Sequence, residues 1–235
     1  MRWACLAGLV FGLASQAAAQ DIVSARYDGP TTRYPHGVLG DEIEYDTLVV
    51  RLSDGREIAA RWAQDIVFED LSPRVVDVDG DGAPEVVVVE SHETQGARLA
   101  IWGMRDGTLA QIAATPHIGT RFRWLAPVAV ADLDGDGLVE LAYVDRPHLA
   151  KVLRVWRYGA DGALTQVASV EGMTNHRIGW DYIAGGLRDC GQGPEMVLAD
   201  AVWANVVAVR FADGALTQQV LGRYSPEALE RALGC

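Results

Sequence analysis

The chain has little of three things that would each point to a particular class of protein. Only 3 of its 235 residues are cysteines, which is too few for a small domain held together by many disulfides. Basic residues are in the minority, with 20 Lys and Arg against 32 Asp and Glu, so the formal net charge is −12. A protein that binds nucleic acid or an anionic membrane needs a basic surface, so the charge argues against both partners.

Long hydrophobic runs are also scarce, and the one at the N-terminus is short. Arg2 precedes an apolar run at residues 3–14, and the small residues Ala17–Ala19 follow it. This order is typical of a secretory signal peptide, and the run falls short of the about 20 residues that span a membrane. We expect residues 1–19 to be a signal peptide and residues 20–235 to be an exported domain, periplasmic or secreted. A membrane anchor is the alternative.

The remaining chain has the composition of a folded protein and repeats a motif. Hydrophobic residues make up 49% of the sequence, which is too many for a disordered chain. The first acidic loop, residues 77–85, recurs 55 residues later as the second acidic loop, residues 132–140, and Glu195 follows after another 55. Asp-Gly pairs, which favour tight hairpins, lie between the loops. They are residues 54–55, 106–107, 161–162 and 213–214.

Together these two markers predict four short antiparallel strands in each repeat. The predicted strands are 74–78, 85–90, 98–104 and 109–114 in the second repeat, 127–131, 139–144, 152–158 and 164–169 in the third, and 183–187, 195–199, 205–211 and 216–221 in the fourth. The first repeat is degenerate, because residues 38–41 lead almost directly into a strand at 47–52.

Four antiparallel strands in about 40–60 residues are typical of a β-propeller blade. We therefore predict an all-β fold, a small β-propeller of about four blades with a degenerate first blade. An arc that pairs with another chain is the second choice. A short C-terminal helix should follow Ser225, a good N-cap, and Pro226, a good first helical residue, and cap the array.

The two acidic loops supply the oxygen ligands that a hard cation prefers. Each loop carries carboxylates at positions 1, 3, 5 and 9 and glycine at position 6, and neither contains the Cys or His that zinc favours. Alternate residues of a tight loop point inward, so these groups can converge on one ion. The predicted ligands are Asp77, Asp79, Asp81, the carbonyl of Ala83 and Glu85, and then Asp132, Asp134, Asp136, the carbonyl of Leu138 and Glu140. We expect about two Ca2+ ions; two ordinary polar turns are the alternative.

The loop and the strand after it resemble the FG-GAP/VCBS repeat, which occurs in integrin-α-like propellers and in many bacterial exported proteins. The resemblance is specific over residues 74–105 and 127–158 and weaker over 183–211. It implies that the loop joins the first two strands of a blade and binds Ca2+. The third loop, residues 187–195, lacks the acids at positions 1 and 5, so no metal is predicted there. Propellers of this family often have seven blades, whereas this chain has length for about four.

The two cysteines of the exported domain are candidates for a disulfide. Cys190 lies in the third loop and Cys235 is the last residue of the chain. Two cysteines in an oxidising compartment form a natural pair, and this pair would hold the loop in place of a metal. Two free thiols are the alternative, because chain ends often fray.

Strand direction places a second group of residues on the face opposite the acidic loops. This candidate ligand face consists of Glu90, Asp145, Asp200, Arg121, Arg177, Trp124 and Trp180. The alternative is that its Arg–carboxylate pairs and packed Trp side chains tie the blades together. The sequence contains no nucleophile elbow, phosphate-binding loop or zinc motif, so no catalytic residue is assigned.

These features predict an exported calcium-binding β-propeller that acts as a non-catalytic binding or interaction module. The partner would be a protein or a glycan, which the sequence does not identify, and self-association into a larger propeller is a third reading. A carbohydrate-acting hydrolase or lyase that uses the candidate ligand face is the main alternative. We expect neither a nucleic-acid partner nor a membrane span.

Overall fold

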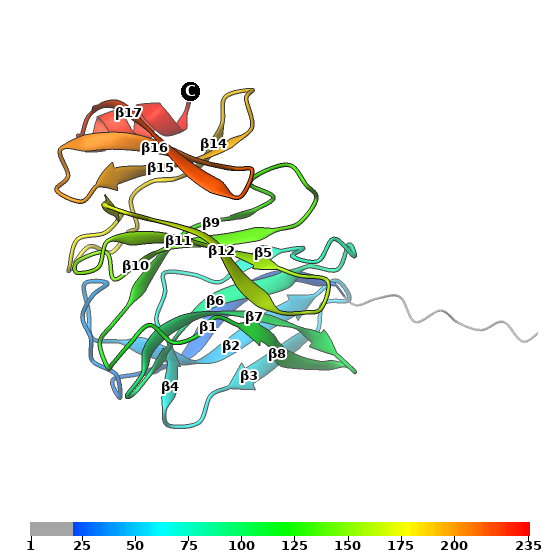
Figure 1. The fold of residues 1–235 in the computed structure, drawn as a ribbon. Helices are drawn as coiled ribbons and strands as arrows, with labels where there is room; N and C mark the ends of the chain where they lie inside the picture. Colours follow the sequence, from blue (N-terminus) through cyan, green and yellow to red (C-terminus); the bar gives the residue numbers. More distant parts are fainter. Residues whose placement is uncertain (1–20) are drawn as a thin grey trace, which may run out of the picture.

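The computed structural model describes residues 21–235, in which antiparallel sheets stack on one another and one short helix follows (Figure 1). The predicted signal peptide at residues 1–19 lies outside the described residues. Within the described part of the chain, no helix is long and apolar enough to cross a membrane. The all-β class and the C-terminal helix are confirmed.

The first sheet has eight strands and folds over on itself. Its strands are β1 (Ile22–Thr31), β2 (Glu44–Leu52), β3 (Glu57–Arg61), β4 (Ile66–Phe68), β5 (Arg74–Val76), β6 (Glu85–His92), β7 (Gly96–Arg105) and β8 (Thr108–Ala114). They run in the order β1-β2-β4-β6-β7-β8, with β3 beside β2 and β5 beside β6. Because β4 bridges β2 and β6, the two halves face each other, and Leu48 and Val50 share a core with Val86 and Val88. The expected separate first blade is therefore part of the same sheet as the second repeat.

The other two sheets each correspond to one predicted repeat. The four-stranded sheet contains β9 (Leu125–Ala131), β10 (Glu140–Asp145), β11 (Val152–Tyr158) and β12 (Leu164–Glu171). The last sheet contains β13 (Met173–Thr174), β14 (Gly186–Asp189), β15 (Pro194–Asp200), β16 (Asn205–Ala212) and β17 (Ala215–Arg223). The observed bounds of β5 to β12 and of β14 to β17 lie within three residues of the predicted strands.

A shared hydrophobic core lies between each pair of neighbouring layers. Val87 of β6 and Leu141 of β10 belong to one core, and Val144 of β10 and Leu198 of β15 belong to the next. The central strands are buried on both faces, which explains their continuous apolar runs. All four side chains of Val86–Val89 are fully buried, and each contributes about 1.5–3 kcal/mol relative to an exposed position.

The helix α1 (Pro226–Leu233) covers the outer face of the last sheet. The Ser225 hydroxyl accepts a hydrogen bond from the Ala228 amide at 3.1 Å, which caps the helix as predicted. Leu229 is buried with Val197 and Val206, whose side chains leave the sheet on this side. In a closed ring of blades the first blade would cover this face, whereas here α1 covers it, at the opposite end of the stack from β3 and β4 (Figure 1).

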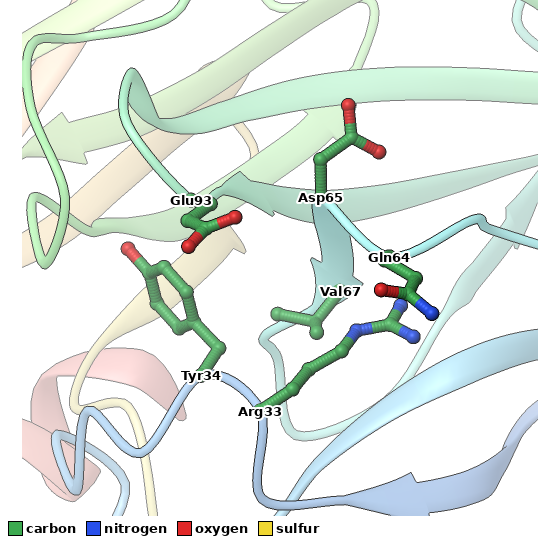
Figure 2. A pocket seen from close by; sticks show the side chains of 6 residues that line it. All are labelled: Arg33, Tyr34, Gln64, Asp65, Val67 and Glu93. Carbon is green, nitrogen blue, oxygen red and sulfur yellow. The ribbon is translucent and has the colours of Figure 1, made fainter.

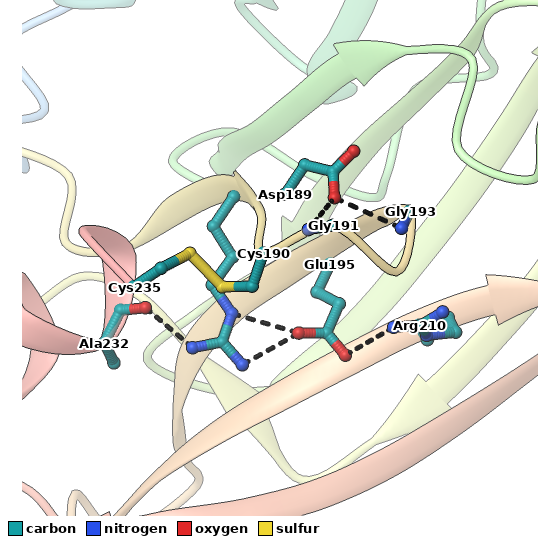
Figure 3. Close-up of a disulfide and its surroundings, with 9 residues drawn as sticks. Asp189, Cys190, Gly191, Gly193, Glu195, Arg210, Ala232 and Cys235 are labelled. Carbon is teal, nitrogen blue, oxygen red and sulfur yellow. Dashed lines mark hydrogen bonds and ion pairs between the residues drawn. A yellow bond between two sulfur atoms is a disulfide. The ribbon is translucent and has the colours of Figure 1, made fainter.

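A disulfide joins the loop between β14 and β15 to the end of the chain. The sulfur atoms of Cys190 and Cys235 are bonded, and their Cα atoms are 5.8 Å apart (Figure 3). Nearby, Nη1 of Arg188 donates a hydrogen bond to the Ala232 carbonyl oxygen at 2.7 Å. These two links hold the C-terminal end of α1 against the sheet.

Reduction of this disulfide should destabilise the protein. The cysteines are 45 residues apart, and the loss of so long a crosslink costs up to about 4 kcal/mol of unfolding free energy. Urea unfolding with and without dithiothreitol measures the effect, with the double change Cys190→Ser and Cys235→Ser as the control. The double variant should have the same urea midpoint as the reduced wild type, and dithiothreitol should not change that midpoint. An unchanged urea midpoint after reduction would contradict the prediction.

Candidate metal centre

Each acidic loop connects the first two strands of its repeat. The first lies between β5 and β6, and the second lies between β9 and β10. Gly80 and Gly82 have φ values of 76° and 88°, and Gly135 and Gly137 have φ values of 81° and 88°. Glycine adopts these values without the steric strain of other residues, so both loops can turn tightly in the same way.

Backbone amides hold the first carboxylate of each loop in place. The two oxygens of Asp77 accept hydrogen bonds from the amides of Gly80 at 2.7 Å and Gly82 at 2.9 Å. Asp132 accepts the equivalent bonds from Gly135 and Gly137 at the same two distances. The loops therefore fold alike, with their acids gathered on one side.

Three carboxylates come together in each loop, but not at equivalent positions. One oxygen each from Asp77, Asp79 and Glu85 lie within 4.8 Å of one another, and so do oxygens from Asp132, Asp134 and Asp136. Asp81 and Glu140 are outside these two groups. The carbonyl groups of Ala83 and Leu138 stay predictions as ligands. Within the described residues, each acidic loop thus places three carboxylates where a metal ion could sit.

The first acidic loop has no positive partner of its own. Burial and, to a smaller extent, the charges of Asp79, Asp81 and Asp77 together raise the pKa of Glu85 to about 7, against a hydrogen bond from the Val78 amide. In the described structure no ion pair joins these four acids to a basic side chain, and Oε1 of Glu85 has no hydrogen-bond partner. A set of carboxylates without neutralisation fits a hard divalent cation.

The second acidic loop contains a cation that belongs to the protein. The guanidinium of Arg157, on β11, contacts Asp134 at 2.7 Å, Asp136 at 2.9 Å and Glu140 at 2.5 Å. Burial raises the pKa of Glu140, and the Leu133 amide and Arg157 oppose this through hydrogen bonds. Oδ1 of Asp134 is buried without a hydrogen-bond partner. Arg157 was not among the residues predicted from the sequence. The pairing of β10 with β11, which places Arg157 opposite Glu140, is the feature that could have identified it.

In the third loop, two arginines form ion pairs with the glutamate at position 9. Glu195 lies between Arg188 at 2.8 Å and Arg210 at 2.9 Å, and their hydrogen bonds, that of Arg210 most, lower its pKa (Figure 3). Asp189 accepts hydrogen bonds from the amides of Gly191 and Gly193, as Asp77 does from its glycines. Among residues 21–235, no group of three acids gathers in this loop, and the absence of a metal here stays a prediction.

The acids of the candidate ligand face are engaged within the protein. Glu90 is fully buried, and it accepts hydrogen bonds from Trp102 at 2.7 Å and from Arg98 at 2.8 Å. Asp145 is paired with Arg146 at 2.7 Å and with Arg154 at 3.0 Å. Asp200 accepts hydrogen bonds from the loop that follows it, including the Ala204 amide at 2.8 Å. These carboxylates therefore hold strands and loops together.

The other residues of the candidate ligand face separate into a buried and an exposed group. Trp124 is buried and donates a hydrogen bond to the Glu69 carbonyl oxygen at 2.9 Å. Arg121 lies over the Phe122 ring, 4.7 Å from its centre. The exposed group is a cluster in which Arg177 lies over Trp203 at 4.6 Å and Trp180 stacks on Tyr182 at 4.5 Å. Arg177 and Tyr182 are exposed, whereas the two Trp side chains are partly buried against the core under α1. The residues of this cluster come from the segment before β14 and from the turn after β15.

A polar pocket of about 390 Å³ opens beside the chain between β1 and β2. Figure 2 shows Glu93 beside the Tyr34 ring and the Arg33 guanidinium beside Gln64. The pocket is also lined by Asp65 and Val67. The sequence analysis did not predict it, because its lining comes from segments far apart in the chain.

A buried polar cluster that the sequence analysis also missed lies in the same part of the fold. Nδ1 of His36 is 2.5 Å from Oε1 of Glu69, and the Ser91 hydroxyl donates a hydrogen bond to the other oxygen of Glu69. Glu44 is also buried, and burial, then the charges of Glu69, Asp41 and Asp70, raise its pKa to about 10. At neutral pH the folded protein therefore keeps Glu44 protonated.

Glu44 should make stability fall as the pH rises. The unfolded chain loses this proton near the usual pKa of 4.5, whereas the folded chain keeps it up to about 10, so higher pH favours unfolding across that interval. Glu44→Gln should therefore be more stable than wild type at pH 8 and similar to it at pH 4, as measured by urea midpoints.

Glu195→Gln is the control with the opposite sign. Because the pKa of Glu195 is lowered, its contribution is present above 4.5 and is lost as the pH falls. This variant should lose stability at pH 7 and approach wild type in acid. Equal pH slopes for Glu44→Gln and wild type would contradict the assignment of a protonated Glu44.

Comparison with known proteins identifies one family match. Residues 77–143 match the family model of the FG-GAP-like repeat. The matched segment begins at the first carboxylate of the first acidic loop and ends within β10, so it contains both acidic loops. A search of curated proteins finds no match. The resemblance stated from the loop residues is confirmed for this segment.

Proposed function

We propose that this chain, which carries an FG-GAP-like repeat at residues 77–143, is an exported Ca2+-binding module that binds a partner and catalyses no reaction. The observation that carries the proposal is the first acidic loop. Asp77, Asp79 and Glu85 offer oxygens within 4.8 Å of one another, in a loop held open by backbone amides. No ion pair of the described structure joins them to a basic side chain, although Arg105 lines the same pocket as Glu85.

Calcium suits this ligand set better than zinc or copper. Ca2+ takes six to eight oxygen ligands in flexible geometry, whereas zinc and copper prefer nitrogen or sulfur, which the loop lacks. The Ca2+ ion would supply the positive charge that lets Glu85 stay ionised in its buried position. Asp77, Asp79 and Glu85 would hold it, and the turn between β5 and β6 would be fixed as a result. Its role is then structural.

The positions of the opposite-face acids support a binding role over the carbohydrate-acting alternative. Most glycoside hydrolases need two carboxyl groups free to reach the sugar, one as acid and one as nucleophile or base. Glu90 and Asp145 are buried and already paired with Arg98, Arg146 and Arg154. Both carboxylates are therefore held by arginines and are not free to reach a sugar.

The exposed aromatic cluster is the surface that we assign to the partner. Trp180, Tyr182 and Arg177 belong to the residue types enriched at the centres of protein interfaces, and flat aromatic rings also suit a sugar face. Tyr182 is 44% exposed and the neighbouring Val202 is 77% exposed. A protein or a glycan is the expected partner.

The setting we propose is an exported, propeller-like array of about four blades. The stacked antiparallel sheets support the blade-like arrangement. The Cys190–Cys235 disulfide supports an oxidising compartment outside the cytosol, because such bonds seldom persist in the presence of cytosolic reductants.

Chelation of calcium should lower the melting temperature. At a Ca2+ concentration 100 times Kd, binding to the folded state alone adds about 2.7 kcal/mol, or roughly 5–10 °C for a chain of this size. Asp79→Asn should lose this gain. Asp189→Asn, at the equivalent position of the third loop, is the matched control and should keep it. Thermal unfolding in Ca2+ and in EGTA measures both, and an equal melting temperature for wild type in the two conditions would sink the proposal.

The non-catalytic role has a separate test. Purified protein incubated with a panel of polysaccharides in Ca2+ should release no oligosaccharides, as measured by chromatography of the soluble products. Release of products that persists in Asp79→Asn and disappears on changing Asp145 and Arg121 together would support the hydrolase or lyase alternative instead.

A further inference from the structure

One position of the repeat differs among the three loops in a way that bears on metal binding. In the pairing of β10 with β11, Arg157 lies opposite Glu140. In β6 and β7, Val86 pairs with Trp102, so the next pair along the ladder places Gly103 opposite Glu85. In β15 and β16, the same step places Arg210 opposite Glu195. We call the glutamate at position 9 of each loop the closing glutamate. The residue that faces it is thus Gly in the first acidic loop, and Arg in the second acidic loop and in the third loop.

We propose that Arg157 is a built-in cation that takes the place of Ca2+ in the second acidic loop, so that the chain binds one Ca2+ ion, in the first acidic loop. The inference rests on the proposed calcium function of the first acidic loop, and it revises the expectation of about two ions. It assigns the choice between a metal-dependent and a metal-independent loop to one residue on the neighbouring strand.

The contacts of Arg157 show why it competes with a metal. Its planar guanidinium presents several N–H donors in a fixed arrangement that suits carboxylates, and it uses them on Asp134, Asp136 and Glu140. Both oxygens of Glu140 already accept hydrogen bonds, and the one on Oε1 comes from the positively charged Arg157. Glu85 in the first acidic loop uses only Oε2, for the Val78 amide.

Packing fixes Arg157 in this position. Its guanidinium lies 5.8 Å from the centre of the Phe211 ring on β16, in the neighbouring sheet. Only 23% of its side chain is exposed. The arginine is therefore part of the inter-sheet contact, and a solvated ion would have to displace it from both the acids and the ring.

The second acidic loop nevertheless keeps the residues of a metal site. Asp132, Asp134 and Asp136 offer oxygens within 4.8 Å of one another, and Oδ1 of Asp134 is buried without a partner. Removal of Arg157 would release Glu140 and leave four carboxylates with no positive charge, which is the condition of the first acidic loop. Substitution of Arg157 should therefore create a site and not merely damage the loop.

Gly103 allows the reverse change in the first acidic loop. A Cβ atom at this position would lie 3.3 Å from Cγ of Glu85, so a side chain there points to the acids and needs only a small shift of its neighbours. Gly103 is not among the glycines of positive φ, so its backbone accepts an arginine. Gly103→Arg therefore copies the arrangement of Arg157 onto the loop that we assign to calcium.

Calorimetric titration of the chelator-treated full chain with Ca2+ tests the proposal. Wild type should bind one ion per chain, Arg157→Gln two, and Gly103→Arg none. Arg157→Lys keeps a positive charge and should still bind one ion.

In wild type, Asp77→Asn should abolish binding and Asp132→Asn should leave it intact. The combination of Gly103→Arg with Arg157→Gln should bind one ion that is lost on Asp132→Asn.

Thermal unfolding gives a second readout that also controls for misfolding. Arg157→Gln should melt below wild type in EGTA, because the buried Glu140 has lost its positive partner, and should recover in Ca2+ by more than wild type gains. The variant can be purified in Ca2+ for this reason. A loss that Ca2+ does not reverse, with one ion or none bound, would overturn the proposal.

The outcomes separate this inference from the calcium function itself. Two ions bound by wild type would overturn the role of Arg157 and leave the calcium function standing. One ion that depends on Asp132 and not on Asp77 would also overturn it. No ion bound by wild type would contradict the proposed function; a site gained in Arg157→Gln would then still support the role of Arg157, and no gain would overturn that too.

Discussion

The closing glutamate of each repeat is the constraint on which the account of this protein depends. Glu85 is 3% exposed and Glu140 is fully buried, each at the start of a central strand that is covered on both faces. A buried carboxylate is costly unless hydrogen bonds and a positive charge accompany it. A backbone amide of the loop supplies the hydrogen bond in both repeats, from Val78 and from Leu133. The positive charge comes from a different source in each repeat.

Each of the three repeats compensates the charge of its closing glutamate differently. In the last repeat two arginines form ion pairs with Glu195, and a disulfide ties the loop to the end of α1. In the middle repeat Arg157 forms an ion pair with Glu140, and its guanidinium also lies over a ring of the next sheet. Among residues 21–235 no ion pair joins Glu85 to a basic side chain, and this is the loop for which we propose an external ion. Under the proposed calcium function, the stack of sheets would thus range from a repeat that depends on metal to one that does not.

The sequence analysis succeeded where the signal was local and failed where it depended on pairing between strands. The Asp-Gly turn at 161–162 and the apolar run of β10 located their hairpins, because turn chemistry and periodicity act over a few residues. β1 was missed because Ile22 is its only buried residue and its other side chains are at least partly exposed, which leaves a weak pattern. Arg157 was missed for a different reason: nothing near it in sequence shows that it faces Glu140. The same holds for Glu90, which looked like a surface acid and is enclosed by Trp102 and Arg98.

A crystal structure of the full chain grown in Ca2+ would test the central claim most directly. The account predicts one ion in the first acidic loop, with oxygen ligands from Asp77, Asp79 and Glu85 at about 2.3–2.6 Å. It also predicts that the Arg157 guanidinium stays on Glu140 in the second acidic loop. A first acidic loop without an ion at saturating Ca2+, or an ion in the second acidic loop with Arg157 displaced, would contradict it.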